Sequence, residues 1–141
     1  MNPVSPADIF ADYNESTRDT PCVLSHSNFD IAEHAFSSSF DPNSGFSTYH
    51  SSQLNPNGGN DASIKNADLD KALEEVRDNV DFAVIRDAME TFQVIYVRDI
   101  IEIPLYYRKN VELHAPNVGN FFANPTQAGP TWNAVDWYIK G

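Results

Sequence analysis

The sequence predicts an α/β protein in which two amphipathic helices are followed by a short crossing strand. Two observations lead to this prediction. Between residues 66 and 98, apolar residues recur every three or four positions in two consecutive segments, the spacing of a helix with one buried face. Directly afterwards, in residues 101–108, apolar side chains occupy every second position, the period of a strand.

Length and charge limit the class of protein. The chain has 141 residues, enough for one hydrophobic core. No apolar run approaches the roughly 18–20 residues that a transmembrane helix needs. Twenty acidic against nine basic residues give a net charge of −11. Because phosphate groups would be repelled, this charge disfavours nucleic acid and anionic membrane surfaces as partners.

Residues 1–21 are polar and interrupted by prolines, and we expect a loop or leader with a short helical turn over residues 7–13. The residues after Met1 lack the basic and apolar regions of a secretion signal. Either the protein is cytosolic or the chain is a fragment that lacks its natural start, and we favour the fragment. Cys22 is the single cysteine, so no intrachain disulfide is expected.

Residues 22–36 are expected to be extended. Apolar side chains fall on both faces of this segment, which is typical of a strand buried on both sides of a sheet. Residues 37–65 are rich in Ser, Asn, Pro and Gly, with turn signals at residues 41–45 and 55–59. So long a connection is more often functional or mobile than structural.

The two helices have clear beginnings. Asn66 is a good N-cap for the first helix, and Asp81 for the second. Both helices have an apolar face that we expect to be buried. Its members are Leu69, Ala72, Leu73 and Val76 in the first helix and Phe82, Ile85, Met89, Phe92 and Tyr96 in the second.

After the helices, Pro104 has no backbone N–H to donate to a neighbouring strand. The strand at residues 101–108 should therefore lie at the edge of a sheet or cross between sheets. Val111 and Leu113 are expected to begin another short strand. Trp132 and Trp137 belong to an aromatic tail that should be docked on protein.

Signatures of catalysis were sought and not found in the sequence. The four histidines and Cys22 show no metal-ligand spacing, so no metal site is expected. The chain has no nucleophile elbow, phosphate-binding loop or dinucleotide fingerprint. We therefore expect neither an enzyme nor a cofactor. A binding role has more support, because the loop after residue 36 follows the carboxyl end of an expected strand and holds Asp41 and Asn43. The alternative, which these residues alone favour, is that Asp41 caps a turn that contains Pro42.

Five short motifs, in this order and at these distances, resemble the peptide-binding receptors of ABC importers, the family-5 extracellular solute-binding proteins. They are Phe29-Asp30-Ile31-Ala32, Asp41-Pro42, Asn66-x-x-Leu69-Asp70, Ile103-Pro104-Leu105-Tyr106-Tyr107 and Trp132-Asn133-x-Val135-x-Trp137.

The resemblance implies a two-lobed, type II periplasmic-binding-protein-like fold, with the helical hairpin packed on a small mixed sheet. Residues 22–108 would be the carboxyl-terminal part of the second lobe, and residues 109–141 would return to an amino-terminal lobe absent from this chain. Tyr107 and Arg108 would form the hinge. The implied partners are a peptide-like solute and the permease, and the full-length protein would be periplasmic or extracellular, held by a lipoprotein anchor.

The resemblance also implies a ligand site. Several family members bind the ligand's amino group with an aspartate three residues before the Asp-Pro step, where this chain has Ser38. A serine cannot form the charge-assisted bond of a carboxylate, so either Asp41 takes that role or the ligand has no free amino terminus. Ser38, Asp41 and Asn43 are the candidate ligand-binding residues. The alternative is a self-associating interaction domain with Phe121, Phe122 and the two tryptophans at its interface.

Overall fold

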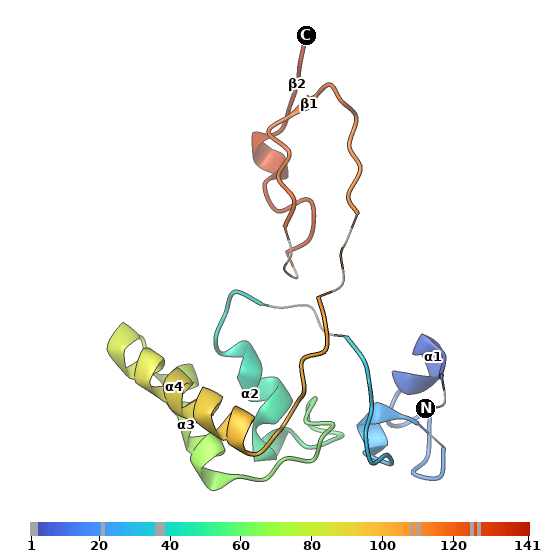
Figure 1. The fold of residues 1–141 in the computed structure, drawn as a ribbon, viewed down its shortest axis with the longest axis vertical. Coiled ribbons are helices and arrows are strands. Elements are labelled where there is room, and N and C mark those ends of the chain that lie inside the picture. Colours follow the sequence, from blue (N-terminus) through green and yellow to red (C-terminus); the bar gives the residue numbers. More distant parts are fainter. Residues whose placement is uncertain are drawn as a thin grey trace. The chain divides into compact units, whose positions relative to one another are not determined.

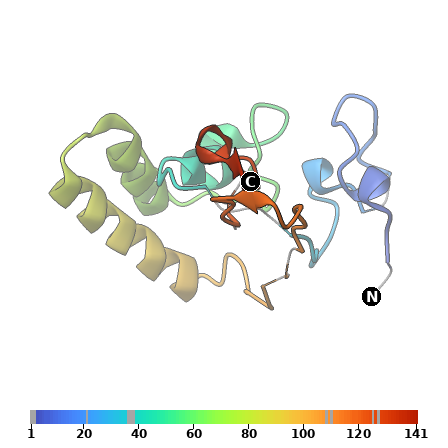
Figure 2. The same cartoon turned by 90° about the horizontal axis from the view of Figure 1, so that it is seen from above.

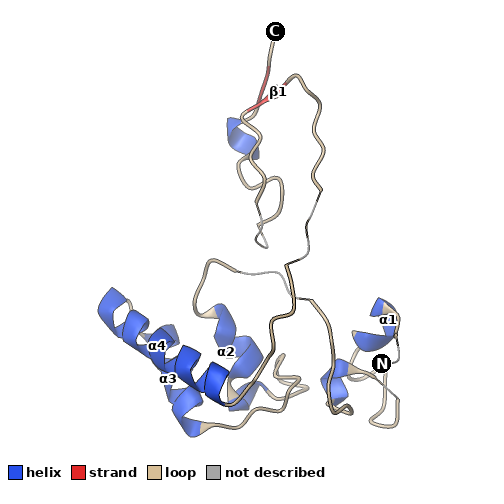
Figure 3. Cartoon of the chain, in the orientation of Figure 1, coloured by secondary structure: helices blue, strands red, loops and turns tan. Residues whose placement is uncertain are grey.

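The computed structural model describes residues 3–20, 22–35, 39–107, 109, 111–124, 126 and 128–141 (Figure 1). The chain divides into two compact units. Unit 1 comprises Met1–His34 and Pro42–Ile103, and unit 2 comprises Ala35–Asp41 and Pro104–Gly141. Helices dominate unit 1, whereas unit 2 is mostly loop (Figure 3).

The amino-terminal part of unit 1 holds two single-turn helices, α1 (Pro6–Ile9) and the 3-10 helix η1 (Leu24–His26). Ser5 caps α1 by accepting a 3.2 Å hydrogen bond from the backbone N–H of Asp8. The predicted helical turn is therefore confirmed, although it starts one residue earlier and is shorter.

Two further helices lie inside the segment that the sequence predicted to be an irregular loop. They are α2 (Ser44–Tyr49) and the 3-10 helix η2 (Ser51–Gln53). Phe46 and Tyr49 lie three residues apart, and both pack against the core residues of unit 1. This apolar pair stabilises a helix in a segment whose Ser, Asn and Gly content alone favours turns, so the loop prediction was wrong for residues 44–49 and 51–53.

Helices α3 (Ala67–Asp78) and α4 (Phe82–Arg98) confirm the predicted helical hairpin. The two helices lie side by side, and α2 packs on α3 (Figure 2). Both predicted caps are present: Asn66 accepts from the N–H groups of Asp68 and Leu69, and Asp81 accepts from Ala83. The four predicted residues of the α3 face are all buried.

The predicted face of α4 is only partly correct. Ile85, Met89, Phe92 and Tyr96 are half-buried, but Phe82 is 78% exposed. The fully buried residues are Ala88 and Ile95, which lie two turns apart. The contact face of α4 is thus rotated away from Phe82, the first residue of the helix, and leaves that ring in solvent.

Three strand predictions were wrong for the residues that the structure describes. Residues 22–35 contain η1 and otherwise irregular backbone, and Ile31 is 91% exposed. Residues 101–107 form no strand, and neither do Val111 and Leu113. Alternating apolar residues favour a strand only where a neighbouring strand completes the hydrogen-bond ladder, and the described chain offers these segments none.

The strands that do form lie in unit 2. There β1 (Val118–Gly119) pairs antiparallel with β2 (Tyr138–Ile139), with Gly119 opposite Tyr138. A 3-10 helix, η3 (Ala134–Asp136), precedes β2. A Cβ atom at Gly119 would lie 2.3 Å from the Tyr138 ring, so a larger residue there would have to displace that ring.

The four α-helices and the two-stranded sheet found among the described residues neither confirm nor exclude a type II binding-protein fold. The predicted fold class therefore stays a prediction, as do the assignments of residues 1–21, 22–108 and 109–141 to a leader and two lobes.

Candidate functional site

The structure describes two of the three predicted ligand-binding residues. Ser38 lies outside the described residues. Asp41 is exposed in unit 2, where its backbone N–H donates a 3.1 Å hydrogen bond to the Ser39 hydroxyl. Asn43 lies in unit 1 at the N-cap position of α2, and its carbonyl accepts from Phe46. A role of these residues in ligand binding stays a prediction.

The predicted hinge also stays a prediction. Tyr107 is fully exposed in unit 2, four residues beyond the boundary between the units, and Arg108 lies outside the described residues.

A buried histidine joins α2, η2 and α3. His50 follows α2, and its Nδ1 caps η2 by accepting a 3.0 Å hydrogen bond from the Ser52 N–H. The imidazole stacks on Phe46, with 4.3 Å between ring centroids, and the Arg77 guanidinium lies 4.4 Å from the centroid of the same phenyl ring. The other nitrogen, Nε2, faces Glu74 Oε1 at 3.5 Å and Asp70 Oδ1 at 3.9 Å.

This cluster places a hydroxyl, an imidazole and a carboxylate in series, the order used by serine hydrolases. Two features favour a structural role instead. The nitrogen that faces the Ser52 hydroxyl at 2.8 Å already accepts the backbone N–H of the same residue. The contact between Nε2 and Glu74 is longer than the roughly 2.6–3.2 Å expected of a base and its orienting partner. Nε2 forms no hydrogen bond with the residues that the structure describes, so its contact with Glu74 is an ion pair only when the ring is protonated.

Asp70 anchors the same region to α3. Its carboxylate accepts hydrogen bonds from the backbone N–H of Ser51 at 2.8 Å and from the Ser51 hydroxyl at 2.5 Å. The Asp70 carboxylate on α3 thus provides a hydrogen-bond acceptor for a backbone N–H in the first turn of η2, which has no acceptor within its own helix. Sequence reasoning missed the cluster because His50 is 20 residues from Asp70, and only their approach in the fold relates them.

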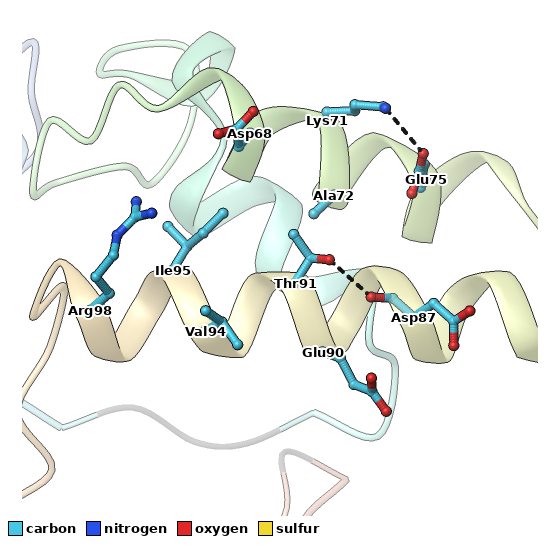
Figure 4. A pocket seen from close by; sticks show the side chains of 10 residues that line it. All are labelled: Asp68, Lys71, Ala72, Glu75, Asp87, Glu90, Thr91, Val94, Ile95 and Arg98. Atoms are coloured by element: carbon cyan, nitrogen blue, oxygen red, sulfur yellow. Dashed lines mark hydrogen bonds and ion pairs between the residues drawn. The ribbon is translucent and has the colours of Figure 1, made fainter.

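An open groove with a volume of about 570 Å³ runs between α3 and α4 (Figure 4). Its apolar part comes from Ala72, Val94 and Ile95. Thr91 and Ile95 point from α4 toward α3, whereas Glu90 projects on the side of α4 away from α3 (Figure 4). The remaining lining residues are polar or charged, namely Asp68, Lys71, Glu75, Asp87 and Arg98.

The charges around the groove are partly paired. Lys71 lies 3.9 Å from Glu75 within α3, and Arg98 donates to Asp99 just beyond α4. The Thr91 hydroxyl donates to the Asp87 carbonyl at 3.1 Å. Since four carboxylates and two cations surround an apolar strip, the groove suits an apolar side chain presented by another protein better than a small anion.

In unit 2, asparagine amides hold the aromatic tail. Asn133 donates to the Asn120 carbonyl at 2.7 Å and accepts from the Trp137 indole at 3.0 Å. The Trp132 indole donates to the Phe122 carbonyl at 2.9 Å. The tail thus packs within its own unit, and half of the Trp132 surface remains exposed.

Neither a metal centre nor a membrane span emerges from the described residues. No group of three or more His, Cys, Asp or Glu side chains among them is arranged to hold a metal ion. None of the helices found there combines the length and apolar character that crossing a bilayer would require.

Comparisons of the chain with known protein families, with curated proteins and with solved structures gave no match. The class of protein therefore has to be argued from the residues and their geometry.

Proposed function

We propose that this chain is a non-catalytic binding module, the carboxyl-terminal portion of a peptide-type solute receptor that serves an ABC importer. The observation that carries the proposal is the order and spacing of the five motifs between Phe29 and Trp137. The hairpin of α3 and α4 supports it, because it begins at the Asn66 motif, where the family has a helical hairpin.

The proposal implies a complete receptor with an amino-terminal lobe, a peptide-like solute bound between the lobes, and delivery to a membrane permease. Such a receptor would be periplasmic or extracellular and held by a lipoprotein anchor. Exposed apolar residues at and after the end of unit 1 are consistent with contact to further protein, because such contact would remove their side chains from water. They are Ile103, Leu105, Tyr107, Val111 and Leu113.

The first test measures ligand binding by calorimetry. The 141-residue chain alone should bind no peptide at micromolar concentrations, and the coding sequence upstream of it should encode a lipoprotein signal and an α/β lobe. Peptide binding should appear when that lobe is supplied. Micromolar binding by the isolated chain, or an upstream sequence that encodes no such lobe, would contradict the proposal.

The second test addresses the ligand's amino group in the reconstituted receptor. Replacing Asp41 with Asn should weaken binding of a free-amino-terminus peptide roughly tenfold or more, because a charge-assisted bond is lost. An amino-acetylated peptide should bind both forms equally. Asp30→Asn is a matched control, since it makes the same charge change at an exposed position elsewhere in the chain. Unchanged affinity for the free peptide would leave Asp41 as a turn residue.

A self-associating interaction domain is the second candidate, and the exposure of Phe122 and Trp132 favours it. Phe121 and Trp137 favour it less, because their rings pack on each other with 5.4 Å between centroids and are half-buried. Sedimentation velocity separates the candidates: a Trp132→Ala, Phe122→Ala variant that self-associates less than the unmodified chain would support this interface.

A further inference from the structure

The outer face of α4 is apolar at both ends and carries opposite charges in the middle. Phe82, Val94 and Val97 are 78%, 66% and 74% exposed. Arg86 and Glu90 lie between them, and both are exposed. Phe82, Arg86, Glu90 and Val94 follow one another at intervals of four residues, so they form one continuous ridge along the helix.

This ridge is symmetric about Ala88. Arg86 lies two residues before that position and Glu90 two after, while Phe82 lies six before and Val94 six after. Ala88 itself is buried, so the two-fold axis would pass at its level along the helix but on the outer side of α4. Two antiparallel copies of α4 related by this axis place each residue of the ridge opposite its counterpart. Arg86 of each copy meets Glu90 of the other, and Phe82 of each copy meets Val94 of the other.

We propose that the outer face of α4 binds a second copy of this chain in that antiparallel register. The charge pattern favours a second copy of the chain as the partner, because the same helix carries both the cation and the anion at mirror-related positions. An isologous contact forms both Arg86–Glu90 pairs at once. This inference does not depend on the proposal of solute binding.

The groove between α3 and α4 gives the phenyl ring of Phe82 a place to pack. Val94 lines that groove and also belongs to the ridge, and Ala72 and Ile95 supply the other apolar walls of the groove. The Phe82 ring of one copy would enter the groove of the other beside Val94 and lose most of its exposed apolar surface. Burial of such a ring is the main favourable contribution to be expected.

Existing bonds do not prevent this contact. Arg86 donates to Asp87 at 2.7 Å and 3.0 Å, but both side chains are more than half exposed. An exposed ion pair contributes little to stability, so Arg86 is available to exchange or share its partner. In the part of the chain that the structure describes, Glu90 forms no ion pair within 4 Å.

The association should be weak. A crossing of two helices buries less surface than the roughly 1,200–2,000 Å² of a standard stable interface. Each copy also carries a net charge of −11, which opposes association. We expect a monomer–dimer equilibrium that appears between roughly ten micromolar and one millimolar.

Sedimentation equilibrium of the full chain and two charge-reversal variants tests the proposal. Arg86→Glu places acid opposite acid at both pairs, and Glu90→Arg places base opposite base, so each variant alone should associate at least roughly tenfold more weakly than the unmodified chain. An equimolar mixture of the two should form a heterodimer, because every acidic side chain of one then meets a basic side chain of the other.

Matched controls separate the register from net charge and from unfolding. The variants Lys65→Glu and Glu33→Arg carry the same charge changes at exposed positions outside α4. Each should dimerise like the unmodified chain apart from the effect of its altered net charge. A mixture of the two should show no preference for the heterodimer. Phe82→Ala should weaken dimerisation while circular dichroism of the helices stays unchanged. A monomer at all concentrations up to about 1 mM would overturn the proposal. So would a mixture of the two α4 variants that fails to associate.

Discussion

The hydroxyl of Tyr96 donates a 2.6 Å hydrogen bond to the carboxylate of Glu102 and so ties the last turn of α4 to the segment that follows it. The ring of Tyr96 meets those of Tyr49 and Phe92 at 5.7 Å and 5.5 Å between centroids, so the bond lies beside an aromatic cluster from two helices. Burial is the main cause that raises the pKa of Tyr96 to about 12, and the hydrogen bond to Glu102 is the second. Burial also raises the pKa of Tyr49, with Glu102 and Tyr96 adding to the effect.

The first prediction concerns alkaline pH. Because the pKa of Tyr96 rises from 10.0 to about 12 on folding, its contribution to the free energy of unfolding is complete below pH 10. That contribution is lost as the pH increases from 10 toward 12, and the raised pKa of Tyr49 acts in the same direction. Urea unfolding at several pH values between 8 and 12 should show this decrease, and absorbance at 295 nm should show two tyrosines titrating late.

Tyr96→Phe is the control for this prediction. It removes the hydroxyl and its hydrogen bond while keeping the ring. The free energy of unfolding should therefore fall by about 1–2 kcal/mol at pH 8, and its decrease above pH 10 should become smaller. If the variant keeps the full alkaline decrease, Tyr96 is not its source.

The second prediction concerns Asn60, which has no exposed surface. Its amide donates to the carbonyls of His50 and Ile64 at 3.1 Å and 2.9 Å, and its carbonyl oxygen accepts from the Ile64 N–H at 2.9 Å. Asn60→Ala removes the partners of the Ile64 N–H and carbonyl, while the His50 carbonyl still accepts from the Gln53 N–H at 3.0 Å. The change should lower the free energy of unfolding by about 2–4 kcal/mol in urea titrations.

Asn60→Asp serves as a comparison, since it keeps the bond from the Ile64 N–H but turns a carboxylate oxygen toward two carbonyl oxygens. It should be at least as unstable as Asn60→Ala at pH 7 and recover in part below pH 4, where the carboxyl is protonated. An alanine variant as stable as the unmodified chain would contradict the bonding described for Asn60.

The third prediction concerns the core of unit 1. Leu73 is buried between α2, α3 and α4, and Leu73→Ala should lower the free energy of unfolding by about 2–5 kcal/mol, because it removes apolar contacts and leaves a cavity. Val80→Ala is the matched control, as Val80 is fully exposed between the two helices and should change stability by less than about 0.5 kcal/mol. Equal effects of the two changes would argue against this core.

The fourth prediction concerns the start of α3. Asn66 caps the helix, and its amide donates to Asp99 at 3.0 Å. Asn66→Ala removes both interactions and should cost about 1–2 kcal/mol, measured by thermal and urea unfolding. Asn66→Ser keeps an oxygen for the cap and loses the reach to Asp99, so it should lie between the alanine variant and the unmodified chain. A serine variant no better than alanine would show that the cap contributes little.

The sequence predicts an element of this structure well only where residues close together in the chain determine that element. The caps and helical spacing of residues 66–98 are local, so they predicted α3 and α4 correctly. Alternation in residues 101–107 is local too, but a strand needs a neighbour, and the described chain supplies none there. The His50 cluster depends on α2 meeting α3, a contact between distant residues that no single-sequence pattern contains.

The polar interior of unit 2 has a thermal consequence. The buried residues among those described in this unit are Gly119, Asn124 and Asn133, and none has a large apolar side chain. Heat capacity rises on unfolding mainly because apolar surface is hydrated, and exposing polar surface lowers it. Unit 2 should therefore unfold with a small heat-capacity change and a broad transition. A calorimetric trace of the whole chain would then show one sharp endotherm, from the helices, above a gradual slope that belongs to the aromatic tail.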